Sequence, residues 1–252
     1  MTTSYELRPL SLGEILDGAL ILLRRNFGLL FGVVLVCQGI PTLMDVYIDL
    51  TGGTSANPGL GLLDRLLTLV AGVFVTGATV RVVSEAYLGR TPELGEAIRF
   101  AGERFGTILG ANIMSGFLTV LAMLAFIIPG IIVACGYSVS SPAAALESGS
   151  STEALRHSWE LTKGFRWKAL GLWAVSVGLI AITYIGAIVV GGVVGKMLGQ
   201  VDAVLAVLGA AASLLIYPVI SCVFTLFYYD LRVRKEGFDI EMLSQQVGGG
   251  IA

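Results

Sequence analysis

The sequence is poor in charge, histidine and cysteine. Only 13% of its 252 residues are charged, against roughly 25% in an average soluble domain. His157 is the only histidine, which excludes a His-rich metal site. It stands in a charged amphipathic helix beside Arg156, which argues against a Ser-His-Asp arrangement. Cys37, Cys135 and Cys222 lie far apart in apolar runs, which excludes a Cys-x-x-Cys pair and indicates small buried apolar residues rather than a disulfide framework. A net charge of −2 argues against a nucleic-acid partner.

Recognisable catalytic motifs are also missing. No Walker-type or dinucleotide-binding glycine motif occurs in the sequence. Intramembrane carboxylates can catalyse, but the sequence offers no paired acids at one depth. We therefore predict that the protein is not an enzyme and that it has no catalytic residues, no cofactor and no metal site.

Charge is absent from the whole stretch between Arg104 and Glu147. That stretch is about twice the roughly 20 residues that one membrane-spanning helix needs. Each central charge would cost about 2.5 to 3.5 kcal/mol to insert into a bilayer, so lipid explains the gap. With 55% hydrophobic residues and a mean hydropathy of +0.84, the sequence predicts a membrane protein that crosses the bilayer several times.

Apolar length predicts an all-α, polytopic protein with a single membrane domain over residues 1–252. We expect an N-terminal cytoplasmic segment at 1–26, a six-span bundle at 27–230 and a cytoplasmic tail at 231–252. The expected spans are 27–48, 62–83, 105–128, 131–146, 169–195 and 203–228. The third and fourth spans should form a tight hairpin at Ile128-Pro129-Gly130, because proline cannot continue a helix and glycine permits a reversal. The short fourth span either tilts less than the others or continues past Pro142 as a kinked segment.

Lysine and arginine lie almost entirely on one side of these spans. In the six-span arrangement, only Arg65 and Lys196 lie on the opposite side. The positive-inside rule then places both termini in the cytoplasm and the 51–61 loop on the outer face. We therefore expect a multi-pass protein of the plasma membrane.

A short charged helix is expected on the cytoplasmic side before each of the three hairpins. Ser11 with Glu14, and Ser150 with Glu153, have the spacing of a capping box. Thr91, followed by proline, is expected to cap the second of these helices. Each helix carries its apolar residues on one face, so we expect these amphipathic "elbow" helices to lie in the membrane interface. The three units suggest a triplicated elbow-plus-hairpin repeat, with three unrelated surface helices as the alternative.

Polar side chains at membrane depth mark a candidate site. Asn112, Ser115 and Thr119 share one helical face, so they either line a cleft facing the fourth span or make interhelical hydrogen bonds. Arg81 and Glu85 form an i,i+4 pair near the cytoplasmic boundary, interpreted as an orienting ion pair or as part of a relay. The candidate cleft residues are Arg81, Glu85, Asn112 and Tyr137.

Four aspartates fall toward the outer ends of spans, namely Asp45, Asp49, Asp64 and Asp202. Such a group can attract a cation. Ordinary solvated helix ends explain these residues better, so we expect the four carboxylates to be solvated.

Acids and bases alternate just after the last span. The bases can meet anionic lipid headgroups, or the segment can act as an intramolecular clamp on the elbow helices. The interspersed acids favour the clamp, because they weaken attraction to lipid and suit paired contacts. The candidate clamp residues are Asp230, Arg232, Arg234, Glu236 and Asp239.

Three stretches resemble one bacterial family. They are 228–239 (YYDLRVRKEGFD), 7–18 (LRPLSLGEILDG), and Pro142 and Glu147 followed by 154–164 (ALRHSWELTKG). Together they are similar to the glycerophosphoryl diester phosphodiesterase membrane-domain family over nearly the whole chain. The resemblance implies an integral membrane region without the catalytic barrel, and hence no phosphodiesterase activity. Proteins of this kind are often encoded near MoxR-type ATPases, which makes such a system a candidate partner beside membrane lipids and other membrane proteins.

These features favour a non-catalytic membrane scaffold or partner-binding module. A transporter or binding protein for a small amphiphile or lipid is the alternative, with the cleft between the second, third and fourth spans as its site. A lipid phosphodiesterase is a remote third hypothesis, because the sequence lacks a metal or acid-base set.

Overall fold

The protein is helical throughout the part that its structure describes. The computed structural model describes residues 9–51, 53, 57–87, 89–147 and 149–237, and no strand occurs among them. The elements are α1 (Leu12–Arg25), α2 (Phe27–Leu50), α4 (Pro58–Tyr87), α5 (Leu94–Glu103), α6 (Phe105–Ala125), α7 (Ile127–Gly136), α8 (Ser140–Leu146), α9 (Ser151–Thr162), α10 (Arg166–Leu198) and α11 (Val201–Glu236). The predicted all-α class is confirmed.

Six stretches of the described chain are long and apolar enough to cross a membrane. They are α2, α4, α6, α7 together with α8, α10 and α11, which fits the predicted multi-pass protein. Several helices run beyond the predicted spans, and α11 continues past Tyr228 to Glu236. The length of an apolar run matches only the thickness of the hydrocarbon core of a bilayer. The helix itself can be longer, because its backbone hydrogen bonds continue into the polar residues that follow.

The turn between α6 and α7 lies earlier than predicted. Phe126 is extended, with φ −161° and ψ 146°, so the chain reverses there and not at Ile128-Pro129-Gly130. Pro129 lies in the first turn of α7, where amide hydrogens have no intrahelical acceptor. Gly130 serves a different purpose, because a Cβ at this position would lie 2.8 Å from the Cα of Met123. The glycine is therefore required by the close approach of the two helices.

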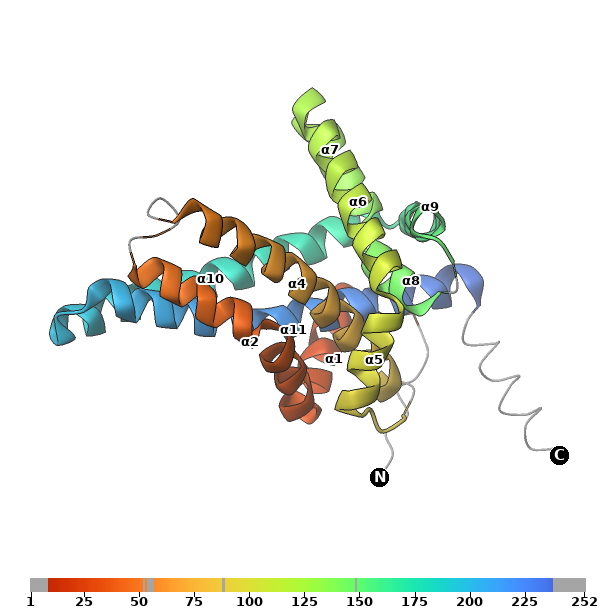
Figure 1. Ribbon diagram of the computed structural model, residues 1–252. Helices are drawn as coiled ribbons and strands as arrows, with labels where there is room; N and C mark the ends of the chain where they lie inside the picture. Colours follow the sequence, from red (N-terminus) through yellow and green to blue (C-terminus); the bar gives the residue numbers. More distant parts are fainter. Residues whose placement is uncertain (1–8, 52, 54–56, 88, 148, 238–252) are drawn as a thin grey trace.

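The fourth span is broken into two helices. α7 ends at Gly136 and α8 begins at Ser140. Pro142 explains the break, because in a continuous helix its ring would clash with the carbonyl of Ser138. The interruption therefore comes before Pro142, and the chain resumes as α8 at a different angle (Figure 1).

The short helices α1, α5 and α9 precede the pairs α2–α4, α6–α7 and α10–α11. Both expected capping boxes are present, at Ser11 with Glu14 and at Ser150 with Glu153. The start of α5 differs from the prediction. Glu93 occupies the N-cap position without a side-chain hydrogen bond, so Thr91 and the proline after it lie in the connection, whose backbone is extended at Glu93.

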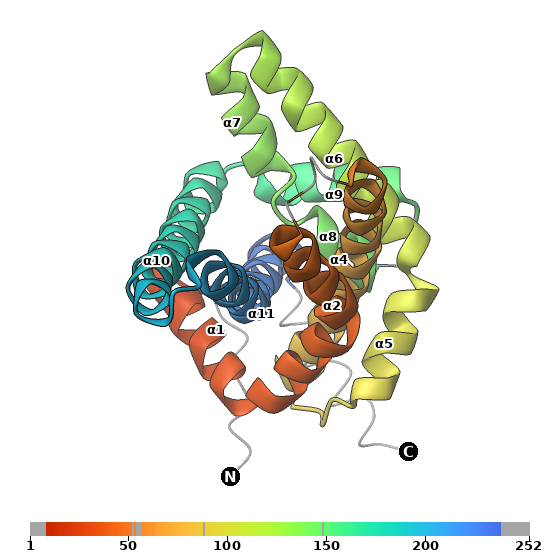
Figure 2. The ribbon, with the colours of Figure 1, turned by 60° about the vertical axis from the view of Figure 1, so that its left-hand side comes forward.

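Helices α2, α4, α10 and α11 lie side by side, and the α6–α7 pair leaves them at a steep angle (Figure 1). Figure 2 looks close to the axis of these four helices and shows the α6–α7 pair extending away from them. The turn from α10 to α11 lies at the opposite end of the molecule from α5 and α9. We call this the turn end, and the end that carries α5 and α9 the elbow end.

The best buried part of the molecule is the second half of α11. Every residue from 222 to 231 is buried, and Phe227 and Tyr228 have no exposed surface. Helix α11 contacts α1, α2, α4, α8 and α9. A helix that is enclosed on all sides can be apolar around its whole circumference, so the elbow end contains the core.

Candidate functional site

A cavity of about 670 Å³ lies where the α6–α7 pair diverges from α4 and α11. Helices α4, α6, α7, α8, α10 and α11 and the α7–α8 connection all contribute to its lining. Binding sites for small molecules typically measure about 300 to 1,000 Å³. Its polar lining residues include Thr76, Asn112, Ser115, Thr119, Tyr137, Ser138, Ser140, Ser141, Tyr217, Ser221 and Thr225.

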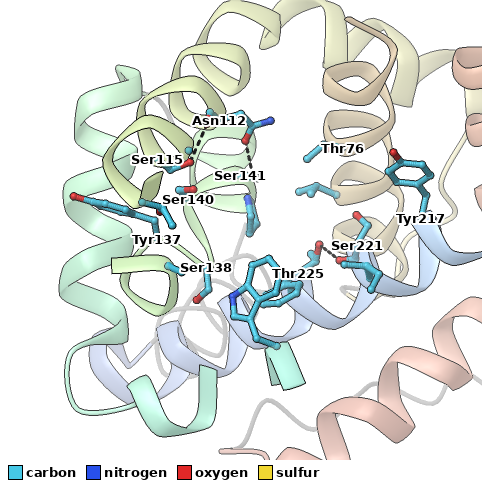
Figure 3. A pocket seen from close by; sticks show the side chains of 18 of the residues that line it. Thr76, Asn112, Ser115, Tyr137, Ser138, Ser140, Ser141, Tyr217, Ser221 and Thr225 are labelled. Atoms are coloured by element: carbon cyan, nitrogen blue, oxygen red, sulfur yellow. Dashed lines mark hydrogen bonds between the residues drawn. The ribbon is translucent and has the colours of Figure 1, made fainter. Parts of the chain in front are cut away.

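One wall of the cavity is formed by α6 and α8. The hydroxyl of Ser141 donates to Oδ1 of Asn112 at 2.7 Å, which joins the two helices (Figure 3). Ser115 donates to the Asn112 carbonyl at 3.2 Å, and Ser138 to the Cys135 carbonyl at 2.9 Å. The break before Pro142 places Ser138 and Ser141 at the cavity, because it turns the start of α8 toward α6.

The facing wall is formed by α4 and α11. The hydroxyls of Thr79 and Ser221 lie 2.6 Å apart and join these helices. Thr76 donates to the Gly72 carbonyl at 2.8 Å, and Thr225 donates to the Ser221 carbonyl at 2.7 Å. A hydroxyl that donates to its own helix keeps acceptor lone pairs, so this wall offers hydrogen-bond acceptors between apolar side chains.

The predicted cleft residues divide into two pairs. Asn112 and Tyr137 line the cavity, and the ring of Tyr137 packs against Trp159 of α9 with 5.4 Å between ring centroids. Arg81 and Glu85 are not among its lining residues. The structure therefore does not bring all four predicted residues to one cleft.

Arg81 and Glu85 form an ion pair of 2.6 Å on α4. Glu85 is buried, and the Arg81 guanidinium lies over the Phe100 ring of α5 at 5.1 Å. The pair thus lies between α4 and α5, where it fixes a helix contact. Of the two interpretations open from the sequence, this geometry fits the orienting ion pair.

The predicted clamp residues form two separate networks. In the first, the Asp230 side chain has no exposed surface. Its Oδ1 accepts from the Leu10 amide at 2.7 Å and from Arg234 Nε at 3.0 Å, and its Oδ2 accepts from Lys168 Nζ at 2.6 Å. Lys168 and Arg234 also donate to the Leu10 carbonyl, at 2.6 and 2.7 Å. This network ties α11 to the start of α10 and to the segment before α1.

The second network joins α11 to α9. Glu236 accepts from Arg232 Nε at 2.6 Å and lies 2.5 Å from Nε2 of His157. The other ring nitrogen of His157 lies 2.7 Å from Glu147, which also accepts from the Tyr228 hydroxyl at 2.7 Å. Asp239, the fifth predicted clamp residue, lies outside the described residues.

Several residues of these sites were not identified from the sequence. The cavity is also lined by Thr76, Tyr217, Ser221 and Thr225. They were missed because a single polar residue in an apolar helix forms no pattern that would mark a site. Lys168 lies two residues after Arg166, at the start of α10. From the sequence it was one of many basic residues expected on the cytoplasmic side. Its partner Asp230 lies 62 residues away, and only the tertiary structure brings the two together.

No group of three or more metal-ligating side chains occurs among the described residues. Comparison of the chain with protein families, with curated proteins and with solved structures found no match. The similarity to the glycerophosphoryl diester phosphodiesterase membrane-domain family thus stays a prediction, and the cavity is the feature on which a functional proposal can be based.

Proposed function

We propose that this chain is a plasma-membrane protein that binds a small amphiphile or a lipid in the cavity between α4, α6, α8 and α11. The observation that carries the proposal is the composition of the cavity walls. Hydroxyl and carboxamide groups of Asn112, Ser141 and Ser221 alternate with apolar side chains such as Val80 and Phe224. An amphiphile has both kinds of surface, so it can satisfy such walls better than water or hydrocarbon alone.

The proposal concerns binding and not catalysis. The residues that line the cavity include no histidine, lysine, arginine, aspartate or glutamate. Its hydroxyls therefore have no neighbouring histidine or carboxylate that could act as a general base.

The proposal also includes an orientation and a place for the elbow helices. Lysine and arginine concentrate at the elbow end, and we propose that this end faces the cytoplasm with both termini. In α1, Ile15, Ala19 and Leu22 are buried whereas Asp17, Arg24 and Arg25 are exposed. This distribution supports an interfacial helix that packs on the bundle and presents its charges to headgroups and water.

Filling the cavity tests the proposed function. Gly116 lines it, and a Cβ at this position would meet no atom within 4 Å. The substitution Gly116→Leu should therefore occupy the cavity without disturbing the helix. We expect it to weaken binding of a lysophosphatidylcholine by at least tenfold, measured by titration of purified protein with a fluorescent analogue.

Gly186→Leu is the matched control, because Gly186 lies on α10, has equally open surroundings and is not one of the residues lining the described cavities. It should bind the lipid as the unmodified protein does. Saturable binding that is equal in both variants, or no saturable binding by the unmodified protein, would contradict the proposal.

The scaffold role predicted from the sequence, with a MoxR-type ATPase system or another membrane protein as partner, stays a prediction. The described contacts are all within one chain, and none of them identifies the chemistry of a partner. Mild-detergent purification followed by protein identification is the measurement that would establish such a partner.

A further inference from the structure

A second cavity, of about 420 Å³, lies toward the turn end of the bundle. Helices α2, α4, α10 and α11 contribute its walls. Tyr217 lines both this cavity and the first one. The lining residues that matter for the argument are Gln38, Asp45, Asp64, Arg65 and Tyr217.

Two polar atoms of this cavity are buried without a partner. Gln38 is 4% exposed and Asp64 is 9% exposed. Neither Nε2 of Gln38 nor Oδ1 of Asp64 has a hydrogen-bond partner. Buried polar groups are almost always hydrogen-bonded, and ionisable groups at membrane depth usually mark functional sites. In this one cavity, the Gln38 amide group lacks an acceptor and the Asp64 carboxylate lacks a donor. The two together point to a ligand that supplies both.

Asp64 also corrects an expectation from the sequence. It is not a solvated helix end, because it is buried within α4, which begins at Pro58, and it lines a cavity together with residues of α2 and α11. Burial of a carboxylate is unfavourable unless a positive or hydrogen-bonding group compensates it. The position of Asp64 thus requires an explanation that Asp49, which is exposed, does not.

The charges around the cavity favour a cationic ligand. Asp45 and Asp64 bring two carboxylates, and Arg65 brings one guanidinium. Asp45 also lines a neighbouring cavity together with Asp49 and Asp202, which extends the negative potential toward the turn end. A cavity of this volume holds a small organic group, and no cluster of three metal-ligating residues occurs in the described chain.

We propose that this cavity binds a protonated primary amine that carries a nearby oxygen acceptor. The phosphoethanolamine head of a lipid has this chemistry, and so does free phosphoethanolamine. The ammonium donates to Oδ1 of Asp64, and the oxygen accepts from Nε2 of Gln38. Because Tyr217 lines both cavities, the apolar chain of the same molecule can occupy the first one. The inference rests on the proposed function and adds to it the class of head group.

The test compares two lipids that differ only in the amine. Lysophosphatidylethanolamine and lysophosphatidylcholine of equal chain length have the same net charge, but the quaternary ammonium of choline has no N–H to donate to Asp64. We expect the purified protein to bind the ethanolamine lipid at least tenfold more tightly. Asp64→Asn should reduce this preference to less than twofold while binding of the choline lipid persists.

Asp49→Asn is the control, because it also removes one carboxylate charge, but from a residue of α2 that does not line this cavity. This variant should keep the preference for the ethanolamine lipid. Gln38→Leu provides a second variant in case Asp64→Asn unfolds. It should weaken the binding of both lipids to the same extent, because both carry the oxygen that accepts from Gln38. Helicity and a monodisperse elution profile identify the variants that fold.

Competition by free phosphoethanolamine distinguishes the two sources of the head group. Displacement of the lipid at millimolar concentration would assign the site to the free molecule, and no displacement would assign it to the lipid; both agree with the proposed chemistry. Equal affinity of the unmodified protein for the two lipids would overturn the inference and leave the proposed function intact. Failure of both lipids to bind would instead contradict the proposed function itself.

Discussion

At the scale of single residues, Asp230 joins three parts of the chain that are far apart in sequence. Its two oxygens accept hydrogen bonds from Leu10, Lys168 and Arg234. The sequence indicated that the acids and bases after the last span would pair within the protein. It gave no indication that Asp230 would be enclosed, because a charge at the end of a span normally meets water.

We predict that Asp230→Ala lowers the free energy of unfolding by about 3 to 5 kcal/mol, because it leaves the Leu10 amide without its acceptor and the part-buried Lys168 ammonium without its counter-charge. Thermal unfolding in detergent, followed by circular dichroism, measures this effect. Glu103→Ala is the control. It removes half of an ion pair whose side chains are 78% and 64% exposed, so it should change the free energy by less than about 0.5 kcal/mol. Equal effects of the two substitutions would show that Asp230 is not a structural anchor.

At the scale of the elements, α9 holds the broken span in place. The carbonyl of Gly136, at the end of α7, accepts from the hydroxyls of Ser158 and Thr162 at 2.9 and 3.1 Å. A Cβ on Gly136 would lie 2.3 Å from the ring of Trp159. The glycine is therefore needed for α9 to reach the backbone of α7, and this contact determines where the serines of the α7–α8 break are placed.

We predict that Gly136→Ala destabilises the protein by about 1 to 3 kcal/mol, because the new methyl group forces Trp159 and the two hydroxyl contacts to shift. The same unfolding measurement applies. Gly186→Ala, in open surroundings on α10, should instead be neutral or stabilising by up to about 1 kcal/mol. A stability of Gly136→Ala equal to that of the unmodified protein would mean that α7 and α9 do not pack as described.

At the scale of the whole molecule, the two ends of the bundle differ in chemistry. The turn end carries carboxylates that line cavities, and the elbow end carries the ion-pair networks and the buried half of α11. The proposed orientation places the turn end outside the cell and the elbow end in the cytoplasm.

Cysteine labelling of whole cells with a membrane-impermeant maleimide tests this orientation. Asn57 and Lys163 are both exposed, the first at the turn end and the second between α9 and α10. We expect Asn57→Cys to be labelled from outside and Lys163→Cys to be labelled only after the membrane is opened. The unmodified protein is the control, since Cys135 and Cys222 are buried and Cys37 lies within α2. The reverse pattern would place both termini outside.

The sequence by itself determined that the chain is helical, that it has six apolar stretches of spanning length, and where two of the elbow helices begin. These properties follow from the local energetics of apolar length and helix capping, which depend on neighbours in the chain. The tertiary structure alone decided which polar groups meet. Asp230 and Lys168 became partners, Asp64 and Gln38 became buried at one cavity, and Arg81 was placed at α5 rather than in the cleft with Asn112. Such contacts depend on the packing of helices that are distant in sequence.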